Sequence, residues 1–278
     1  MIRKYENQLN EILEANVEVH TKMIHDYNSE PHFSPENQEK VKQRLLALKK
    51  RNESDKILDI GCGTGFIINL AKNIFSEIHG VDITIAMLEK IDIENYNITL
   101  HNSVAEQLPF EDASFDLVTS YAFIHHVEKY EDVLKDAYRV LNSTGIMYID
   151  LEPNKQFWTV MDSLDKTKNY STILNKEVDS VLHTDEKVSK EYDITPEVFN
   201  KAEYTKSILG GIDPEELTEI ARKIGFSKVE VYHEWFLGEG SVSHQQSFEN
   251  AKIVDSYLKE CLPLTKHLYK YLRFILVK

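Results

Sequence analysis

The stretch "ILDIGCGTGF" at residues 57–66 joins a short apolar run, an acidic residue and three glycines at alternate positions. The apolar run predicts a buried strand, and the residues that follow the last glycine, "FIINLAKNI" (66–74), have the apolar spacing of a helix. A glycine-rich turn between a strand and a helix lets the backbone approach a ligand closely, and it presents the free N–H groups of the helix start. We therefore predict a small-ligand site at the end of this strand.

Outward from this stretch, strand patterns alternate with helix patterns. We expect strands at 77–82, 97–102, 114–121, 145–151, 227–235 and 271–278, and helices at 84–91, 129–141, 213–226 and 247–262. Strands that alternate with helices of these lengths are typical of βαβ units, in which helices cover both faces of a parallel sheet. The predicted fold class is therefore α/β, with a doubly wound, Rossmann-like sheet.

The same patterns divide the chain into four segments. Residues 1–50 are expected to form an N-terminal helical lid, 51–151 the ligand-binding core, 152–211 a helical cap inserted into the core, and 212–278 the remainder of the sheet. Inside the cap, Thr195 and Pro196 match the N-cap and the first position of a helix. Asp213 and Pro214 make the same match where the core resumes.

Composition narrows the choice of partners. The chain has 278 residues and a net charge of -14, without a long Lys/Arg cluster, so nucleic acid is disfavoured as a partner. The two cysteines, Cys62 and Cys261, lack the paired spacing of a zinc site, and we predict no metal. We find neither a secretory signal nor a long apolar span, so the expectation is a cytoplasmic protein that does not bind membranes. A homodimer is left open.

Dinucleotide-binding folds use a similar turn, but their fingerprint is GxGxxG, whereas this chain has GxGxG followed by Phe66. Asp82, in "GVDIT", ends the second strand, where a carboxylate can accept both ribose hydroxyls of either ligand. Four motifs in order, "ILDIGCGTG", "GVD", "AEQLPFEDASFDLV" and "RVLNSTGIMYI", resemble the class I S-adenosylmethionine-dependent methyltransferases of the ubiquinone-biosynthesis type. The resemblance covers about residues 40–152.

The resemblance implies a seven-stranded sheet whose last strand is antiparallel, with S-adenosyl-L-methionine as the cofactor. It places the methionine part of the cofactor on Asp59 and the 61–65 loop, the ribose on Asp82, and the sulfonium beside Tyr121. The full set of implied cofactor residues is Asp59, Gly61, Cys62, Gly63, Gly65, Asp82, Ile83, Ala105, Glu106 and Tyr121, with Ala105 and Glu106 near the adenine.

The chain departs from the family pattern at two points. The family usually has an acid before the Ala-Glu pair, which accepts a hydrogen bond from the adenine amino group, and this chain has Val104 there. Adenine recognition then depends on backbone groups or on Asn102. The "LNSTG" turn replaces the family's "LKPGG", which we expect to alter only the turn. Cys62 is better explained as a small packing residue than as a nucleophile.

Two adjacent histidines, His125 and His126, follow the strand at 114–121 and are the candidate catalytic residues. Methyl transfer is an in-line displacement that mainly needs alignment, and a base is needed only when the nucleophile carries a proton. An imidazole suits that role near neutral pH. The alternative, a histidine at a helix start that bonds to the backbone, is favoured, and at most one of the two should face the pocket.

Substrate contacts are expected from the lid and the cap. Tyr27, His32 and Phe33 precede a helix start and could fold over the cofactor, although a solvated loop explains them equally well. Trp158 could line the acceptor site from the cap, although the cap aromatics could instead form its own small core.

The leading functional hypothesis is a methyltransferase that acts on an O, N or C atom of a small molecule. One alternative is an enzyme that binds S-adenosylmethionine but uses it for cyclisation or elimination. Another is a protein methyltransferase, and an RNA methyltransferase is disfavoured by the acidic charge. A non-catalytic binding module is improbable because the loop, Asp59 and Asp82 are intact.

Overall fold

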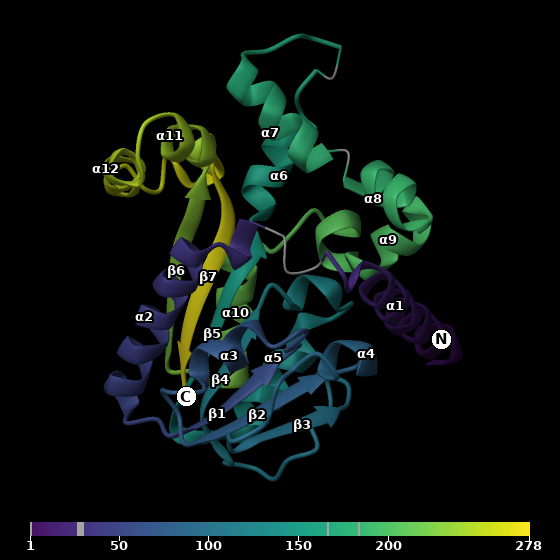
Figure 1. Cartoon of the computed structure of the whole chain (residues 1–278), viewed down its shortest axis with the longest axis vertical. Helices are drawn as coiled ribbons and strands as arrows, with labels where there is room; N and C mark the ends of the chain where they lie inside the picture. Colours follow the sequence, from purple (N-terminus) through teal and green to yellow (C-terminus); the bar gives the residue numbers. More distant parts are fainter. Residues whose placement is uncertain (1, 27–30, 166, 183) are drawn as a thin grey trace.

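The computed structural model describes residues 2–26, 31–165, 167–182 and 184–278. Its centre is a seven-stranded sheet in the order β3-β2-β1-β4-β5-β7-β6 (Figure 1). Strands β1 to β5 run parallel, whereas β7 is antiparallel to both of its neighbours, which confirms the predicted sheet. The strands are β1 (Lys56–Ile60), β2 (Glu77–Asp82), β3 (Ile98–Asn102), β4 (Phe115–Tyr121), β5 (Leu141–Pro153), β6 (Lys228–Phe236) and β7 (Tyr269–Val277).

Helices cover both faces of this sheet. One face packs against α5 (Tyr130–Val140) and α10 (Pro214–Ile224), and the other packs against α2 (Pro35–Asn52) and α3 (Phe66–Ala71). The apolar residues of α5 at positions 133, 134, 137 and 140 are all buried, as the helical spacing predicts. A short helix, α4 (Ile85–Leu88), follows β2, and the C-terminal part adds α11 (Glu239–Gln245) and α12 (Phe248–Glu260).

The remaining helices lie beside the core. The N-terminal helix α1 (Ile2–Met23) packs against α9 (Pro196–Ala202), and the short turn η2 (Pro31–Phe33) leads into α2. Between β5 and α10 the chain forms α6 (Lys155–Asp162), α7 (Thr172–Leu182), α8 (Thr184–Tyr192), α9 and the π-helical turn η4 (Tyr204–Ile208). In Figure 1 these green helices project from one end of the sheet, next to α1. None of the helices in the described ranges is long and apolar enough to span a bilayer.

Local sequence signals set several of these boundaries. The Thr195 side chain accepts a hydrogen bond from the backbone N–H of Val198, and Asp213 accepts from two backbone N–H groups of α10, so both predicted N-caps are confirmed. The chain leaves the sheet after Pro153 and returns at Ile212, whose backbone N–H donates to the Pro153 carbonyl at 2.8 Å. The two ends of the cap therefore lie side by side, next to the carboxyl end of β5.

Two elements differ from the expectation. The strand expected at 145–151 begins at Leu141, directly after α5, because Leu141 pairs with Phe115 before an irregularity in the ladder. The helix α11 was not expected, since "EGSVSHQ" carries little apolar periodicity. Its N-cap is Gly238, which has a left-handed backbone conformation.

Candidate active site

The loop after β1 is held in place by the end of β2. The backbone N–H groups of Gly61 and Cys62 donate to the Val81 carbonyl at 2.8 and 3.0 Å. The Asp82 carboxylate accepts the Gly63 N–H at 2.9 Å through one oxygen and the Thr84 N–H at 2.8 Å through the other. Asp82 therefore fixes the loop that the sequence identified.

Two cavities adjoin this loop at the carboxyl ends of the parallel strands. The larger encloses about 530 Å³, including its open mouth, between the loop, the end of β2 and helix α1. The smaller encloses about 310 Å³ beside η2 and the end of β4. Gly61, Gly63 and Ala122 line both cavities, so the two spaces meet at the loop. Ligands of open α/β sheets bind at this edge.

The larger cavity has the kind of lining that a nucleoside requires. Ile83, Met87 and Ala105 give it an apolar lining suited to a flat base. Each oxygen of Asp82 already accepts one backbone N–H, and because a carboxylate has about four lone-pair sites, it can still accept the ribose hydroxyls. Asn102 points elsewhere, since its amide nitrogen donates to the carbonyls of Asp82 and Ile83, so its proposed contact with adenine finds no support here.

Most of the predicted cofactor residues come together around these cavities. Those that line at least one of them are Asp59, Gly61, Cys62, Gly63, Asp82, Ile83, Ala105, Glu106 and Tyr121. The tenth, Gly65, is the left-handed N-cap of α3 and shapes the turn. The side chain of Cys62 is buried in the core cluster between the sheet and α3, which fits its interpretation as a packing residue.

Asp59 is a buried acid at the floor of the smaller cavity. It is 2% exposed, and its Oδ1 accepts a hydrogen bond from Thr119 Oγ1 at 2.8 Å. Burial raises the pKa of Asp59 to about 8, although the Thr119 hydrogen bond opposes the shift. No lysine or arginine pairs with Asp59 in the described part of the chain. A cationic group of a ligand bound beside Asp59 would therefore stabilise the ionised form of this carboxyl.

Aromatic side chains surround the rest of the smaller cavity. His32, Phe33, Phe66 and Tyr121 all line it, so two of the predicted substrate residues lie where the reactive end of the cofactor is expected. The ring centroids of Phe66 and Tyr121 are 4.6 Å apart, and those of Phe33 and Phe66 are 5.2 Å apart. Burial, with a smaller contribution from nearby His125, lowers the pKa of His32 to about 4, so this imidazole is neutral at pH 7.

The two adjacent histidines have different environments. His125 Nδ1 lies 2.8 Å from Oε2 of Glu152, a fully buried carboxylate that also accepts the backbone N–H groups of Phe123 and Ile124. His126 Nδ1 lies 2.8 Å from the carbonyl oxygen of Ala202, and the His126 ring lines the larger cavity. Of the two rings, that of His126 lines one of these cavities and that of His125 lines neither, but the ring centroids are 4.1 Å apart, so the side chains do not diverge as expected.

The cap contributes an acid to this pair. Glu203 lies 3.8 Å from His125 Nε2 and 3.6 Å from His126 Nδ1, and these three side chains are close enough to ligate a metal ion. However, Lys206 Nζ already lies 2.7 Å from the Glu203 carboxylate and supplies the positive charge that this carboxylate faces.

The other candidate residues are placed differently. Trp158 is buried in a cap cluster with Phe157 and Met161 and lines neither cavity, so its role in substrate binding stays a prediction. Tyr27 lies outside the described residues.

Sequence patterns did not reveal the contribution of α1 to the larger cavity, made by Leu13, Asn16 and His20. The signal was present, because these residues share a helix face at i, i+3 and i+7, but the periodicity does not say which surface that face covers.

Comparisons with known proteins agree with this geometry. Residues 58–149 match the methyltransferase domain family. The chain is 28% identical over 199 residues to a demethylmenaquinone methyltransferase of Chlorobaculum parvum, an alignment that covers 68% of this chain and 75% of that enzyme. It is 34% identical over 129 residues to a demethylmenaquinone methyltransferase of Listeria welshimeri, covering 43% of this chain and 55% of the relative.

A solved structure shares the fold. The S-adenosylmethionine-dependent methyltransferase of Archaeoglobus fulgidus superposes with a TM-score of 0.51 at 20% identity, covering 87% of this chain and 94% of that one. The sheet order, the position of the glycine-rich loop, the two adjoining cavities and the matched domain lead to one conclusion. The chain contains a class I S-adenosylmethionine-dependent methyltransferase domain.

Proposed function

We propose that this methyltransferase acts on a small planar molecule that meets the cofactor in the smaller, aromatic cavity. The observation that carries the proposal is the junction of the two cavities at Gly61, Gly63 and Ala122. A nucleoside in the larger cavity would place the other end of the cofactor beside Tyr121. Bound there, S-adenosylmethionine supplies the methyl group, and the chain aligns the acceptor and excludes water.

Two kinds of relative support a small-molecule acceptor. The matched enzymes of Chlorobaculum parvum and Listeria welshimeri are demethylmenaquinone methyltransferases, and a malonyl-[acyl-carrier protein] O-methyltransferase of Bacillus cereus is 26% identical over 147 residues. The uncharged aromatic walls around His32 and Phe66 favour a planar ring over a flexible cation. Among these relatives, the cavity is therefore more compatible with a quinone-type acceptor.

We further propose His126, rather than His125, as the base for acceptors that must lose a proton. His126 lines the larger cavity, and its Nδ1 donates to the Ala202 carbonyl oxygen, which leaves Nε2 as the basic atom of this imidazole. His125 lines neither cavity, and its two ring nitrogens face the carboxylates of Glu152 and Glu203 at 2.8 and 3.8 Å. We therefore assign His125 a supporting role behind this wall of the cavity.

The test combines a labelled methyl group with a panel of acceptors. The purified protein is incubated with [methyl-¹³C]-S-adenosylmethionine and with naphthalene-1,4-diol, catechol and histamine, and the products are analysed by mass spectrometry. A gain of one labelled methyl group on an aromatic acceptor is expected. Conversion of the cofactor without methylation of any acceptor would instead favour cyclisation or elimination.

Single variants then separate the histidines. His126→Ala should lower turnover by roughly a hundredfold or more, because a general base typically contributes that much. His125→Ala should instead leave Glu152 without its imidazole partner and mainly lower the stability of the fold. Equal turnover in wild type and His126→Ala would exclude the base.

The cap at 152–211 remains the proposed substrate domain. Its Glu203 reaches both histidines and holds Lys206. Glu203→Gln should raise the KM for the acceptor while leaving cofactor affinity near wild type, with Glu197→Gln on the exposed side of the same helix as the control. A cytoplasmic location is part of the same proposal, since both cysteines are free thiols.

A further inference from the structure

The hydrogen bonds of Asn37 fix the direction of the Tyr121 hydroxyl. Asn37 Nδ2 lies 2.7 Å from the backbone carbonyl oxygen of His32 and 2.8 Å from Tyr121 Oη. A carbonyl oxygen can only accept, so the Asn37 atom that faces it must be the NH₂ group rather than the amide oxygen. The same NH₂ group therefore donates to Tyr121, and the Tyr121 oxygen is the acceptor in that contact.

The hydrogen of the Tyr121 hydroxyl must then point elsewhere. Tyr121 is 9% exposed and lines the smaller cavity together with His32 and Phe66. Among the residues that the structure describes, none accepts a hydrogen bond from this hydroxyl. Burial raises the pKa of Tyr121, so the hydroxyl keeps its hydrogen at any physiological pH. A buried donor without a partner is costly, which marks it as a contact point for a ligand.

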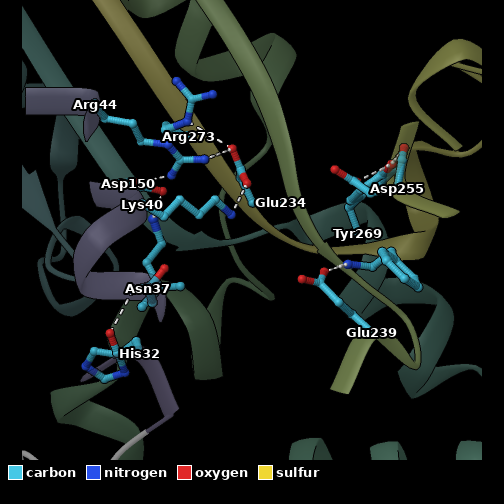
Figure 2. Close-up of polar contacts among 12 residues, drawn as sticks. His32, Asn37, Lys40, Arg44, Asp150, Glu234, Glu239, Asp255, Tyr269 and Arg273 are labelled. Carbon is cyan, nitrogen blue, oxygen red and sulfur yellow. Dashed lines mark hydrogen bonds and ion pairs between the residues drawn. The ribbon is translucent and has the colours of Figure 1, made fainter. Parts of the chain in front are cut away.

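Asn37 is itself held firmly. It is 7% exposed and lies in the first turn of α2, where its backbone N–H donates to the N-cap Ser34. Further along α2, Lys40 and Arg44 form ion pairs with Glu234 of β6 at 2.8 and 2.5 Å. Figure 2 shows Asn37 hydrogen-bonded to His32, and it shows the side chains of Lys40 and Arg44, further along the same helix, extending toward Glu234.

We infer that Tyr121 donates a hydrogen bond to an oxygen of the methyl acceptor and that Asn37 is the positioning residue that directs this donor into the cavity. This inference rests on the proposed function and names the acceptor class more narrowly. The acceptor is a planar ring that bears an oxygen beside the atom to be methylated, such as a phenolate, an enolate or a reduced quinone. An aromatic amine without oxygen would leave the donor unpaired.

The charge and shape of the cavity fit this class. Phe33 and Phe66 supply flat walls, and neutral His32 neither repels nor attracts a charged ring. A hydroxyl donor stabilises the negative charge that an acceptor oxygen gains when it loses its proton, and hydrogen bonds to charged groups are about twice as strong as neutral ones. Charge of this kind is present on the oxygen of a phenolate or enolate that reacts at the atom beside that oxygen.

A double-mutant cycle tests the inference with naphthalene-1,4-diol as the acceptor. Tyr121→Phe should lower kcat/KM by about tenfold to a hundredfold, the range for a lost hydrogen bond to a charged oxygen. Asn37→Asp keeps the side-chain size but offers a carboxylate that draws the Tyr121 hydrogen back, and it should cause a similar loss. In the Tyr121→Phe background Asn37→Asp should add less than about twofold, since both changes remove the same contact. Gln43→Ala, on the exposed side of α2, is the matched control and should leave kcat/KM unchanged.

The outcomes separate this inference from the proposed function. Three results would each overturn the inference. The first is a pair of losses that multiply in the double variant, and the second is turnover of 1-aminonaphthalene as fast as that of the diol. The third is a loss of S-adenosylmethionine affinity in Tyr121→Phe as large as the loss of kcat/KM. If the wild type methylates neither probe, the proposed acceptor class fails, and the role of Asn37 is decided without an acceptor. For that purpose, the ¹³Cζ resonance of Tyr121, assigned with Tyr121→Phe, should shift in Asn37→Asp but not in Gln43→Ala. An unshifted resonance would refute the role of Asn37.

Discussion

Asp59→Asn should stabilise the protein without its cofactor, and the gain should depend on pH. Burial raises the pKa of Asp59 from 3.8 to about 8. Between pH 3.8 and pH 7 the unfolded chain therefore releases a proton that the folded chain retains, so stability falls as pH rises through this window. At about 1.4 kcal/mol per pH unit, the cost reaches roughly 4 kcal/mol at pH 7.

The amide of the variant does not titrate, yet its oxygen can still accept the hydrogen bond from Thr119 Oγ1. The free energy of unfolding of the variant relative to wild type should therefore rise by about 1.4 kcal/mol per pH unit from pH 5 to pH 7 and level off above pH 8. Urea unfolding of both proteins at each pH measures this difference, with Asp92→Asn, an exposed acid, as the control. A difference that stays constant across this range would show that Asp59 is ionised in the folded protein.

The same acid should couple cofactor binding to proton release. The cofactor carries an ammonium group, and a cation next to Asp59 favours the ionised carboxyl, so binding should tighten as pH rises toward 8. Calorimetry at pH 6.5 in two buffers of different ionisation enthalpy measures the released proton. Asp59→Asn should abolish the release, and an unchanged release in the variant would assign the proton to another group.

Three further changes probe the site and its support. Asp82→Ala removes the acceptor of the Gly63 N–H and the proposed acceptor of the ribose hydroxyls, and it should weaken S-adenosylmethionine binding in calorimetry by about a hundredfold or more, whereas Asp92→Ala should not. Gly61→Ala places a Cβ 2.1 Å from the Phe123 ring, so it should displace that ring and weaken cofactor binding. Glu234→Gln leaves the buried Arg273 without its carboxylate partner and Arg44 with Asp150 alone, and it should destabilise the fold by about 3–5 kcal/mol in urea unfolding, with turnover preserved in the folded fraction if Glu234 only supports α2.

The sequence predicted the core well because its signals are local. Each predicted strand overlaps an observed one, since apolar runs bounded by turns specify a strand buried on both faces. The glycine-rich loop was found for the same reason, because the turn, the preceding acid and the following helix lie within ten residues. Asp82 could be added because the acid at the end of the second strand returns to the first loop in any doubly wound sheet.

Several contacts that build the candidate site join residues that are distant in sequence. Asn37 and Tyr121 are 84 residues apart, and Ala202 and His126 are 76 residues apart. The periodicity of α2 places Asn37 on the buried face, four residues before Val41, and leaves Gln43 off that face, but it does not show that the Asn37 amide reaches Tyr121. The histidine pair could be noticed, but its division of roles required the positions of Glu152 and of the cap.

The two sides of the candidate site, one proposed for the cofactor and one for the acceptor, depend on different parts of the fold. The larger cavity is built mainly from loops that follow β1 to β4, and α1 adds one wall, so most of this cavity forms together with the sheet. The acceptor side depends on η2, whose His32 carbonyl is tied through Asn37 to α2, and α2 is tied to β5 and β6 by Arg44, which contacts Asp150 and Glu234. A buried ion pair can fix geometry even where it adds little stability, so we expect this network to set where His32 and Phe33 of η2 lie beside the smaller cavity. A change in the network should therefore alter acceptor binding while S-adenosylmethionine affinity stays near wild type.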